Sequence, residues 1–236
     1  MKSSYSHIVS LFALVLVVGC ASTKVTERNE YKGGKLARPA HIWVYDFAAT
    51  PAEIPAVSAL AGQPTEHATP QTAEQIATGR EVGSQIAAQL VQDIQEMGLP
   101  ARRASSGTKP DINDLVFRGY LLSVDEGSAT KRVAIGFGSG ASHLTTAVEG
   151  YQMTAQGLRK LGSGSLESGA NKTPGGAVGV AAVIATGNPV GLVVGGGMKA
   201  YGEYSGSSKI EGRAKETAKE IAVQIKPKFQ QQGWIQ

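Results

Sequence analysis

A single cysteine, Cys20, stands at the end of an apolar N-terminal run, and it limits what this chain can fold into. Because the chain has no second cysteine, it can form neither an internal disulfide framework nor a cysteine-rich metal site. Lys2 precedes the apolar residues 8–18, and Gly19 comes directly before Cys20. A basic start, an apolar run and a small residue at the cut site are the parts of a secretory signal. We therefore expect residues 1–19 to be a signal peptide outside the fold.

The position of Cys20 favours a lipoprotein signal. Val17, Val18 and Gly19 match the aliphatic and small residues that precede the cysteine in such signals. A thiolate is the nucleophile that accepts a diacylglyceryl group, so a cysteine is required there. We expect cleavage between Gly19 and Cys20 and fatty acyl chains, such as palmitate, on Cys20. The alternatives are an ordinary signal with an accidental cysteine and an uncleaved membrane helix, which needs about 20 apolar residues.

The residues after Cys20 predict a location and a tether. Ala21 follows the cysteine, and in enteric-type sorting a residue other than Asp there implies transfer to the outer membrane. We expect a cell-envelope protein anchored by lipid and facing the periplasm. Residues 20–38 are polar and charged without hydrophobic periodicity, which is typical of a flexible tether. Residues 39–236 are long enough for a single domain with its own core.

Short strands and helices predict an α/β (α+β) domain with a small mixed sheet. Residues 41–47 are rich in β-branched and aromatic types on both alternating faces, which indicates a central strand covered on both sides. Further strands are predicted at residues 99–104, 114–125 and 145–161. Residues 163–173, rich in Gly and Ser, are typical of a flexible linker.

Two capping boxes predict the packed helices. The first, Thr72-x-x-Gln75, precedes apolar residues at helical spacing, and Gly98 supplies the stop. The second, Ser208-x-x-Glu211, opens a C-terminal helix that Pro227 should end or kink. Trp234 is expected to fill a groove of the domain.

Residues 175–198 carry no charged side chain. Small residues recur there at intervals of four, as in a glycine zipper, and Asn188-Pro189 interrupts the run, so we expect a helical hairpin inserted in the domain. The glycines concerned are Gly175, Gly179, Gly187, Gly191 and Gly195. An uncharged surface of this kind predicts contact with another copy, an envelope protein or the bilayer.

A second glycine-rich segment formally matches the dinucleotide-binding pattern, through Gly136, Phe137, Gly138, Gly140 and Ala141. A true site needs a helix at the third glycine and an acid about 20 residues later. Here strand-like residues follow, and the nearest acid, Glu149, comes too early. We expect a loop that needs positive φ angles or close backbone contact, and no nucleotide.

The chain offers few groups for catalysis. His41, His67 and His143 stand far apart, and the acidic pair Asp125-Glu126 is typical of a solvated strand end. We therefore expect no enzyme, no cofactor and no metal. The formal charge of +4 would fall to +3 with the loss of Lys2, and the basic residues are scattered, so no nucleic-acid partner is expected.

The loop from Gly136 to Ser142, the strand Ala147-Val148-Glu149-Gly150-Tyr151 and the glycine-rich run together resemble the bacterial domain-of-unknown-function family numbered 4410. The resemblance covers roughly residues 40–234. It implies an exported, mostly lipid-anchored protein without an established activity, and it supplies no active-site residues.

These observations favour a non-enzymatic envelope lipoprotein that acts by association with envelope proteins or the membrane. The alternative is a periplasmic module that binds a small molecule or glycan. Its pocket would lie between residues 48–70 and the Gly136 loop, with Tyr45, Asp46 or Arg118 converging on it. Trp43 and Tyr45 are expected to pack in the core, the alternative being that they stack on a ligand.

Overall fold

The first capping box begins the helix that the sequence predicts. The computed structural model describes residues 22–61, 72–125, 143–169 and 207–236. In it α1 spans Ala73–Glu96; the Thr72 hydroxyl accepts a hydrogen bond from the Gln75 N–H at 3.2 Å, and the Gln75 side chain accepts one from the Thr72 N–H at 2.8 Å. Gly98, with φ +81°, ends the helix. The helix buries one apolar stripe, which contains Val82, Ile86, Leu90 and Ile94.

A parallel pair of strands flanks α1 in the chain, at two of the places where strands were predicted. β2 spans Ile42–Val44 and β3 spans Ala101–Arg103, and they pair in parallel. β4, Leu115–Asp125, pairs in parallel with the other side of β2. The short parallel unit therefore has β2 in its middle.

Antiparallel pairing extends the sheet from β4. β5 spans His143–Thr154 and β6 spans Gly157–Gly169, and Gly157 takes φ +108° at the turn that joins them. The six strands of the described residues form one mixed sheet in the order β1-β6-β5-β4-β2-β3. β6 contains Ser163 and the residues that follow it, so the predicted linker at residues 163–173 is wrong as far as Gly169. Pairing with a strand on each side outweighs the linker-like composition.

The tether predicted at residues 20–38 is also wrong in part. β1, Ser22–Asn29, pairs antiparallel with β6, from Ser22 opposite Gly169 to Asn29 opposite Ser163. The outer edge of β6 presents unpaired N–H and C=O groups, and β1 satisfies them. A polar edge strand buries too little apolar surface to show hydrophobic periodicity, which explains the wrong prediction.

The C-terminal helix α4 spans Ser207–Gln232 and starts one residue before the predicted cap. It runs through Pro227, so the helix does not end at this proline, and the other predicted effect, a kink, stays a prediction. Proline removes the donor for the carbonyl of Val223, and because Val223 lies on the exposed side of the helix, water can replace that donor. Trp234 is buried and packs against Phe229, with ring centroids 5.6 Å apart, as expected.

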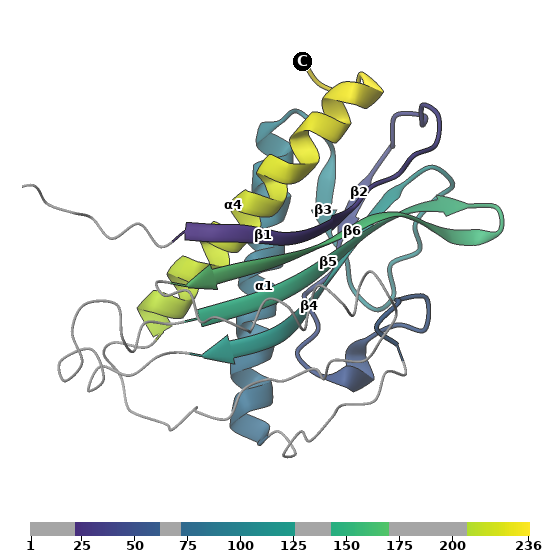
Figure 1. The fold of residues 1–236 in the computed structure, drawn as a ribbon. Coiled ribbons are helices and arrows are strands. Elements are labelled where there is room, and N and C mark those ends of the chain that lie inside the picture. Colours follow the sequence, from purple (N-terminus) through teal and green to yellow (C-terminus); the bar gives the residue numbers. More distant parts are fainter. Residues whose placement is uncertain (1–21, 62–71, 126–142, 170–206) are drawn as a thin grey trace, which may run out of the picture.

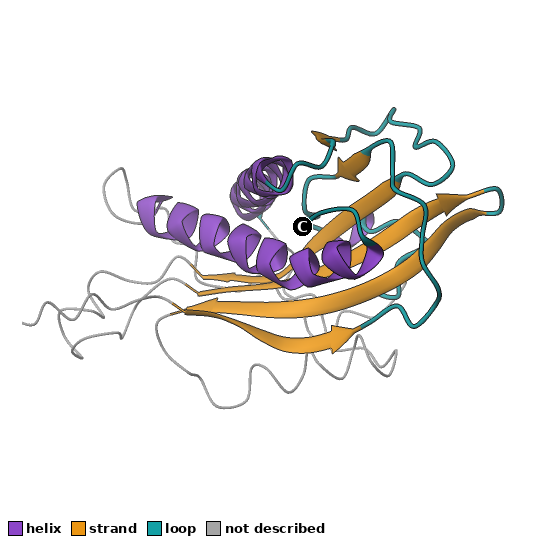
Figure 2. Ribbon diagram, turned by 90° about the horizontal axis from the view of Figure 1, so that it is seen from above, coloured by secondary structure: helices purple, strands orange, loops and turns teal. Residues whose placement is uncertain are grey.

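The sheet has one aliphatic face and one polar, aromatic face. Both helices lie on the same side of the sheet and pack on each other (Figures 1 and 2). On that face Ile42 and Val44 are fully buried. Trp43 and Tyr45 point to the other face and are only half-buried, so the prediction that they lie in the core and that both faces of this strand are covered is wrong. Residues 48–61, with the short helix η1 (Pro51–Glu53), cover part of this second face.

Several predicted features lie outside the described residues. They are the signal with Gly19 and Cys20, the loop with Gly136, Phe137, Gly138 and Gly140, and the hairpin at residues 175–198. No helix in the described part of the chain is both long and apolar enough to span a bilayer.

Candidate binding sites

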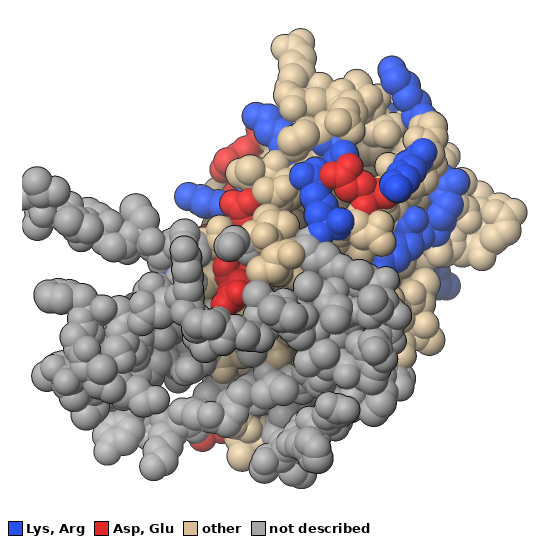
Figure 3. Space-filling model, in the orientation of Figure 1, with Lys and Arg blue, Asp and Glu red and all other residues tan. Residues whose placement is uncertain are grey.

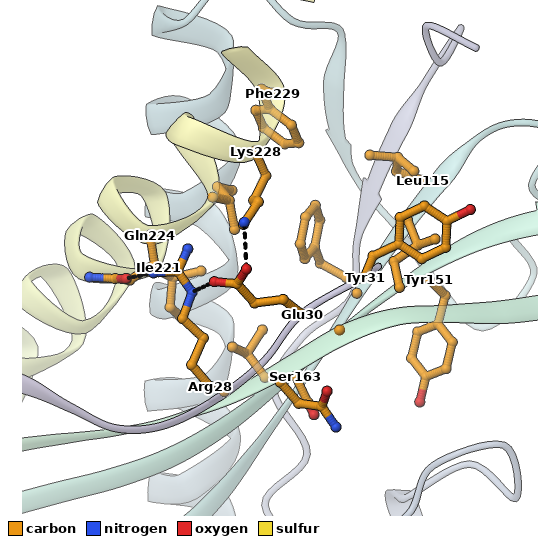
Figure 4. Close-up of a pocket in the computed structure, with 18 of the residues that line it drawn as sticks. Arg28, Glu30, Tyr31, Leu115, Tyr151, Ser163, Ile221, Gln224, Lys228 and Phe229 are labelled. Atoms are coloured by element: carbon orange, nitrogen blue, oxygen red, sulfur yellow. Dashed lines mark hydrogen bonds and ion pairs between the residues drawn. The ribbon is translucent and has the colours of Figure 1, made fainter. Parts of the chain in front are cut away.

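An apolar groove lies between α4, β1 and the helix-covered face of the sheet (Figure 4). It encloses about 180 Å³. Strands and helix both supply hydrocarbon side chains to it. These include Val25, Leu36, Phe117, Val148, Leu161, Leu166, Ile221, Ile225, Phe229 and Trp234.

Glycines in the strands leave the space beneath α4 open. Gly150 of β5 and Gly162 and Gly164 of β6 line the groove, so the sheet presents no side chains at these points. A Cβ on Gly162 would lie 2.7 Å from the carbonyl oxygen of Asn29. Gly162 therefore also allows the close approach of the chain at the end of β1.

Charged side chains surround the mouth of the groove. Glu30 is 2.6 Å from Arg28 Nε and 2.6 Å from Lys228 Nζ, and Arg28 also donates to Gln224 (Figure 4). The hydrogen bond from Lys228 is the main cause that lowers the pKa of Glu30. The segment that follows β1 carries Lys32, Lys35 and Arg38, all exposed, and Arg38 donates to the Gly98 carbonyl at the end of α1. Figure 3 shows Lys and Arg gathered on this side of the molecule around a smaller acidic patch.

A second, polar hollow of about 580 Å³ lies beyond the carboxyl ends of β2 and β3. Tyr45, Asp46 and Arg118 all line it, as the alternative prediction required, while the Gly136 loop lies outside the described residues. The Arg118 guanidinium carbon lies 3.9 Å from the centre of the Tyr45 ring. The Tyr45 hydroxyl donates to the Thr108 carbonyl at 3.4 Å.

Two ion pairs border this polar hollow. Arg80 Nε is 2.7 Å from Glu53, and Arg103 pairs with Asp46. Burial raises the pKa of Glu53, but hydrogen bonds from the Ala49 N–H and from Arg80 outweigh burial and lower it. Both carboxylates are therefore already neutralised by cations of the chain.

The polar face of the sheet buries a carboxylate, Glu149, at 1% exposure. One of its oxygens accepts hydrogen bonds from the hydroxyls of Tyr120 at 2.9 Å and Tyr151 at 2.6 Å. The other accepts from Lys160 Nζ at 2.6 Å and from the Ala59 N–H at 3.4 Å. The hydrogen bond to Ala59 ties residues 48–61 to the sheet.

The sequence model of a family described as a domain of unknown function (DUF4410) matches residues 42–187, more than half of the chain. The chain belongs to the DUF4410 family. The resemblance inferred from the sequence is thereby confirmed. The DUF4410 match begins at β2, so β1 and α4, which close the apolar groove, lie outside the matched residues.

Two solved structures of the PelC dodecamer from Paraburkholderia phytofirmans, one of them a variant, resemble this DUF4410 protein. Their identities to this chain are 14% and 13%, and their TM-scores are 0.36 and 0.37. Each alignment covers 69% of this chain and 91% of the PelC chain. No curated protein matches the sequence.

Within the DUF4410 domain, the structure groups residues that the sequence left apart. His41 Nδ1 lies 3.5 Å from Asp114, and the two form a cluster with Asp111 whose ligand-type atoms lie within 4.8 Å of one another. Both Asp114 oxygens already accept N–H donors, from His41, from the Trp43 indole and from Asp111. Asp114 therefore acts as a hydrogen-bonded clamp between β2 and the start of β4.

Sequence reasoning missed Glu149 and the groove. Glu149 was considered only as an acid too early for a nucleotide site, although an acid between apolar strand residues needs a buried partner. The acidic pair placed at a strand end is correctly located in part, since Asp125 is the last residue of β4. His143 opens β5, and His67 lies outside the described residues.

Proposed function

We propose that this chain is a non-enzymatic lipoprotein of the bacterial cell envelope that works by binding. In this proposal the groove under α4 holds the hydrocarbon chain of an amphiphile. The observation that carries it is the apolar lining of that groove beneath a charged mouth. The thin catalytic inventory of the sequence supports binding over catalysis.

The chemistry of the groove favours a hydrocarbon chain with an anionic end. Its volume of about 180 Å³ exceeds the roughly 150 Å³ of an engineered apolar cavity that binds benzene. Burial of an apolar ligand there is favourable by about 25 cal/mol per Å². Among the residues that line the groove, the two cations Arg28 and Lys228 outnumber the one carboxylate, Glu30. Such a mouth attracts a carboxylate or phosphate head group.

The predicted lipid anchor supplies the setting. Two or three acyl chains on Cys20 would hold the domain at a membrane more firmly than the single chain that binds only reversibly. We propose the outer membrane, with the domain in the periplasm. Acyl chains are the abundant apolar molecules at that surface, which supports an amphiphile as the ligand.

The test uses contact quenching by brominated fatty acid. The chain without its signal and with Cys20→Ser is titrated with dibromostearate, whose bromines quench only nearby tryptophan. We expect saturable quenching of Trp234, which lines the groove. A Trp234→Phe variant, which retains only Trp43 on the other face of the sheet, should lose that quenching. Equal quenching in both proteins would rule out the groove as the binding place.

A second test fills the groove with a larger side chain and compares that variant with one changed on the exposed side of α4. Ile225 lines the groove, whereas Val223, two residues earlier on α4, is exposed. Ile225→Phe should therefore weaken binding of the brominated fatty acid by about tenfold, and Val223→Phe should leave it unchanged. Similar affinities for both variants would contradict an acyl chain in the groove.

We also propose that residues 175–198 mediate association with another copy, an envelope protein or the bilayer. The support is the uncharged sequence with glycines at four-residue spacing. Deleting these residues should change the oligomer size or the ease of extraction from membranes. If both stay the same, the segment has no part in association.

A further inference from the structure

We propose that the polar hollow beyond β2 and β3 is a binding site for an oxyanion, the carboxylate or phosphate of a polar small molecule, and that Arg118 is its anchor. The site is separate from the groove under α4. It opens on the other face of the sheet and shares no lining residue with the groove. The proposal therefore does not depend on the amphiphile.

Of the arginines at this hollow, Arg118 differs from Arg80 and Arg103 in having no carboxylate partner among the described residues. Arg80 is neutralised by Glu53, and Arg103 by Asp46. Among the described residues, Arg118 has no carboxylate within ion-pair distance, and its buried Nε has no hydrogen-bond acceptor. A guanidinium with unused donors is the strongest recognition group for an oxyanion that a side chain provides.

Glu149 does not take the place of the missing partner. It stands opposite Arg118 in the register of β4 and β5. Its oxygens, however, accept hydrogen bonds from Tyr120, Tyr151 and Lys160. Lys160 already balances the charge of Glu149, so Arg118 keeps a positive field of its own.

Arg118 is held in position before any ligand arrives. Its backbone is fixed in β4, opposite Glu149 of β5 and one residue beyond the last pair with β2. Its guanidinium stacks on the Tyr45 ring, and the Tyr45 hydroxyl is itself held by the Thr108 carbonyl. A pre-positioned side chain loses little conformational freedom on binding, which favours affinity.

The surroundings fit a polar molecule. Ser105, Ser106 and Thr108 also line the hollow and add hydroxyls to its polar lining. A volume of about 580 Å³ lies within the range of small-molecule sites, roughly 300–1,000 Å³. The hollow also lies beyond the carboxyl ends of parallel strands, where open α/β sheets bind their ligands.

The experiment follows the Arg118 Nε–H signal in two-dimensional NMR. The mature chain with Cys20→Ser is titrated with citrate, with inorganic phosphate and, as a neutral polyol, with glycerol. We expect citrate or phosphate to shift this signal saturably and glycerol to leave it unchanged. Citrate alone indicates a carboxylate ligand, and phosphate alone a phosphate ligand. No shift with either anion, or an equal shift with glycerol, would overturn the proposal.

Two pairs of variants locate the site. Arg118→Gln should weaken anion binding, measured by calorimetry, by about tenfold or more, while Arg102→Gln, an exposed arginine on β3, should not change it. If Arg118→Gln does not fold, Ser106→Glu supplies an internal carboxylate to Arg118 and should also weaken binding, unlike Ser106→Gln. Unchanged affinity in Arg118→Gln, or equal affinities in Ser106→Glu and Ser106→Gln, would contradict the site.

Discussion

Glu149 shows what a charged residue needs inside this sheet. Taking a carboxylate out of water is costly unless donors replace the water. Several donors do so here, among them Tyr120, Tyr151, Lys160 and the Ala59 N–H. The carboxylate in turn raises the pKa of both tyrosines, although burial is the larger cause. The cluster fixes residues 48–61 over the sheet.

Glu149→Gln should therefore destabilise the domain. The amide keeps the size of the side chain but replaces one acceptor oxygen by a donor, which opposes the hydroxyl protons or Lys160. We expect a loss of about 2–3 kcal/mol in the free energy of unfolding, measured with urea. Glu81→Gln, an exposed helical carboxylate, should change stability by less than about 0.5 kcal/mol. Equal effects of the two changes would show that the cluster contributes nothing.

The same cluster makes stability depend on acid. Burial raises the pKa of Glu149, but the hydrogen bonds from Lys160, Tyr151 and Ser58 and the charge of Lys160 outweigh it and lower the pKa below 4.5. The contribution of Glu149 is therefore complete above pH 4.5 and is lost as the pH falls through the folded-state pKa. The stability gap between the wild type and Glu149→Gln should shrink below pH 4.5. A gap that stays constant there would contradict this.

At the scale of elements, glycines allow the segment after β2 to sit between α1 and β4. A Cβ on Gly83 of α1 would overlap the carbonyl oxygen of Phe47, and one on Gly119 of β4 would overlap the Phe47 ring. The Phe47 N–H also donates to the Gly83 carbonyl at 3.3 Å. Phe47 is thereby fixed in a slot that only glycine leaves open.

Two helical glycines should respond to alanine in opposite directions. Gly83→Ala must displace the backbone at Phe47 and should destabilise the domain by about 2 kcal/mol or more. Gly212→Ala on α4 meets no atom within 4 Å and should stabilise by up to about 1 kcal/mol, because alanine is the better helix former. Urea unfolding of both variants measures this. Stabilisation by Gly83→Ala would mean that the slot does not exist in solution.

The sequence predicted elements that depend on local interactions and missed elements that depend on contacts between distant segments. α1 was predicted with its cap at Thr72, because the capping box and the apolar stripe are local signals. β1 and the second half of β6 were missed, since their polar and glycine-rich residues form strands only through pairing with distant partners. α4 does not end at Pro227, because the cost of a proline depends on whether water can reach the freed carbonyl.

For the whole molecule, the binding sites could be predicted only in part. The convergence of Tyr45, Asp46 and Arg118 on one hollow was anticipated in the alternative prediction of a binding module. The groove was not anticipated. It joins β1, the central strands and α4, and it exists because glycines of β5 and β6 omit side chains under the helix. Local sequence patterns show neither the order of the strands in the sheet nor which glycines lie under the helix.

The distance between anchor and fold gives the last prediction. β1 begins at Ser22, one residue after Ala21, so an acylated Cys20 would hold the edge of the sheet close to the bilayer without a long tether. At about 3.3 Å per extended residue, the span from Cys20 to Ser22 is below roughly 10 Å. Replacing Cys20 by Ser should move the protein from the membrane fraction to the soluble fraction of the envelope and remove the acyl mass.

A spacer should separate anchoring from orientation. Inserting a flexible Gly/Ser stretch after Ala21 keeps Cys20 and the anchor but frees the sheet edge from the surface. Membrane fractionation should then be unchanged, while protection of β1 from added protease should fall, because the bilayer no longer shields it. If the wild-type protein carries no acyl mass on Cys20, the anchor proposal fails. If only the spacer has no effect, the anchor stands and the bilayer does not shield the sheet edge.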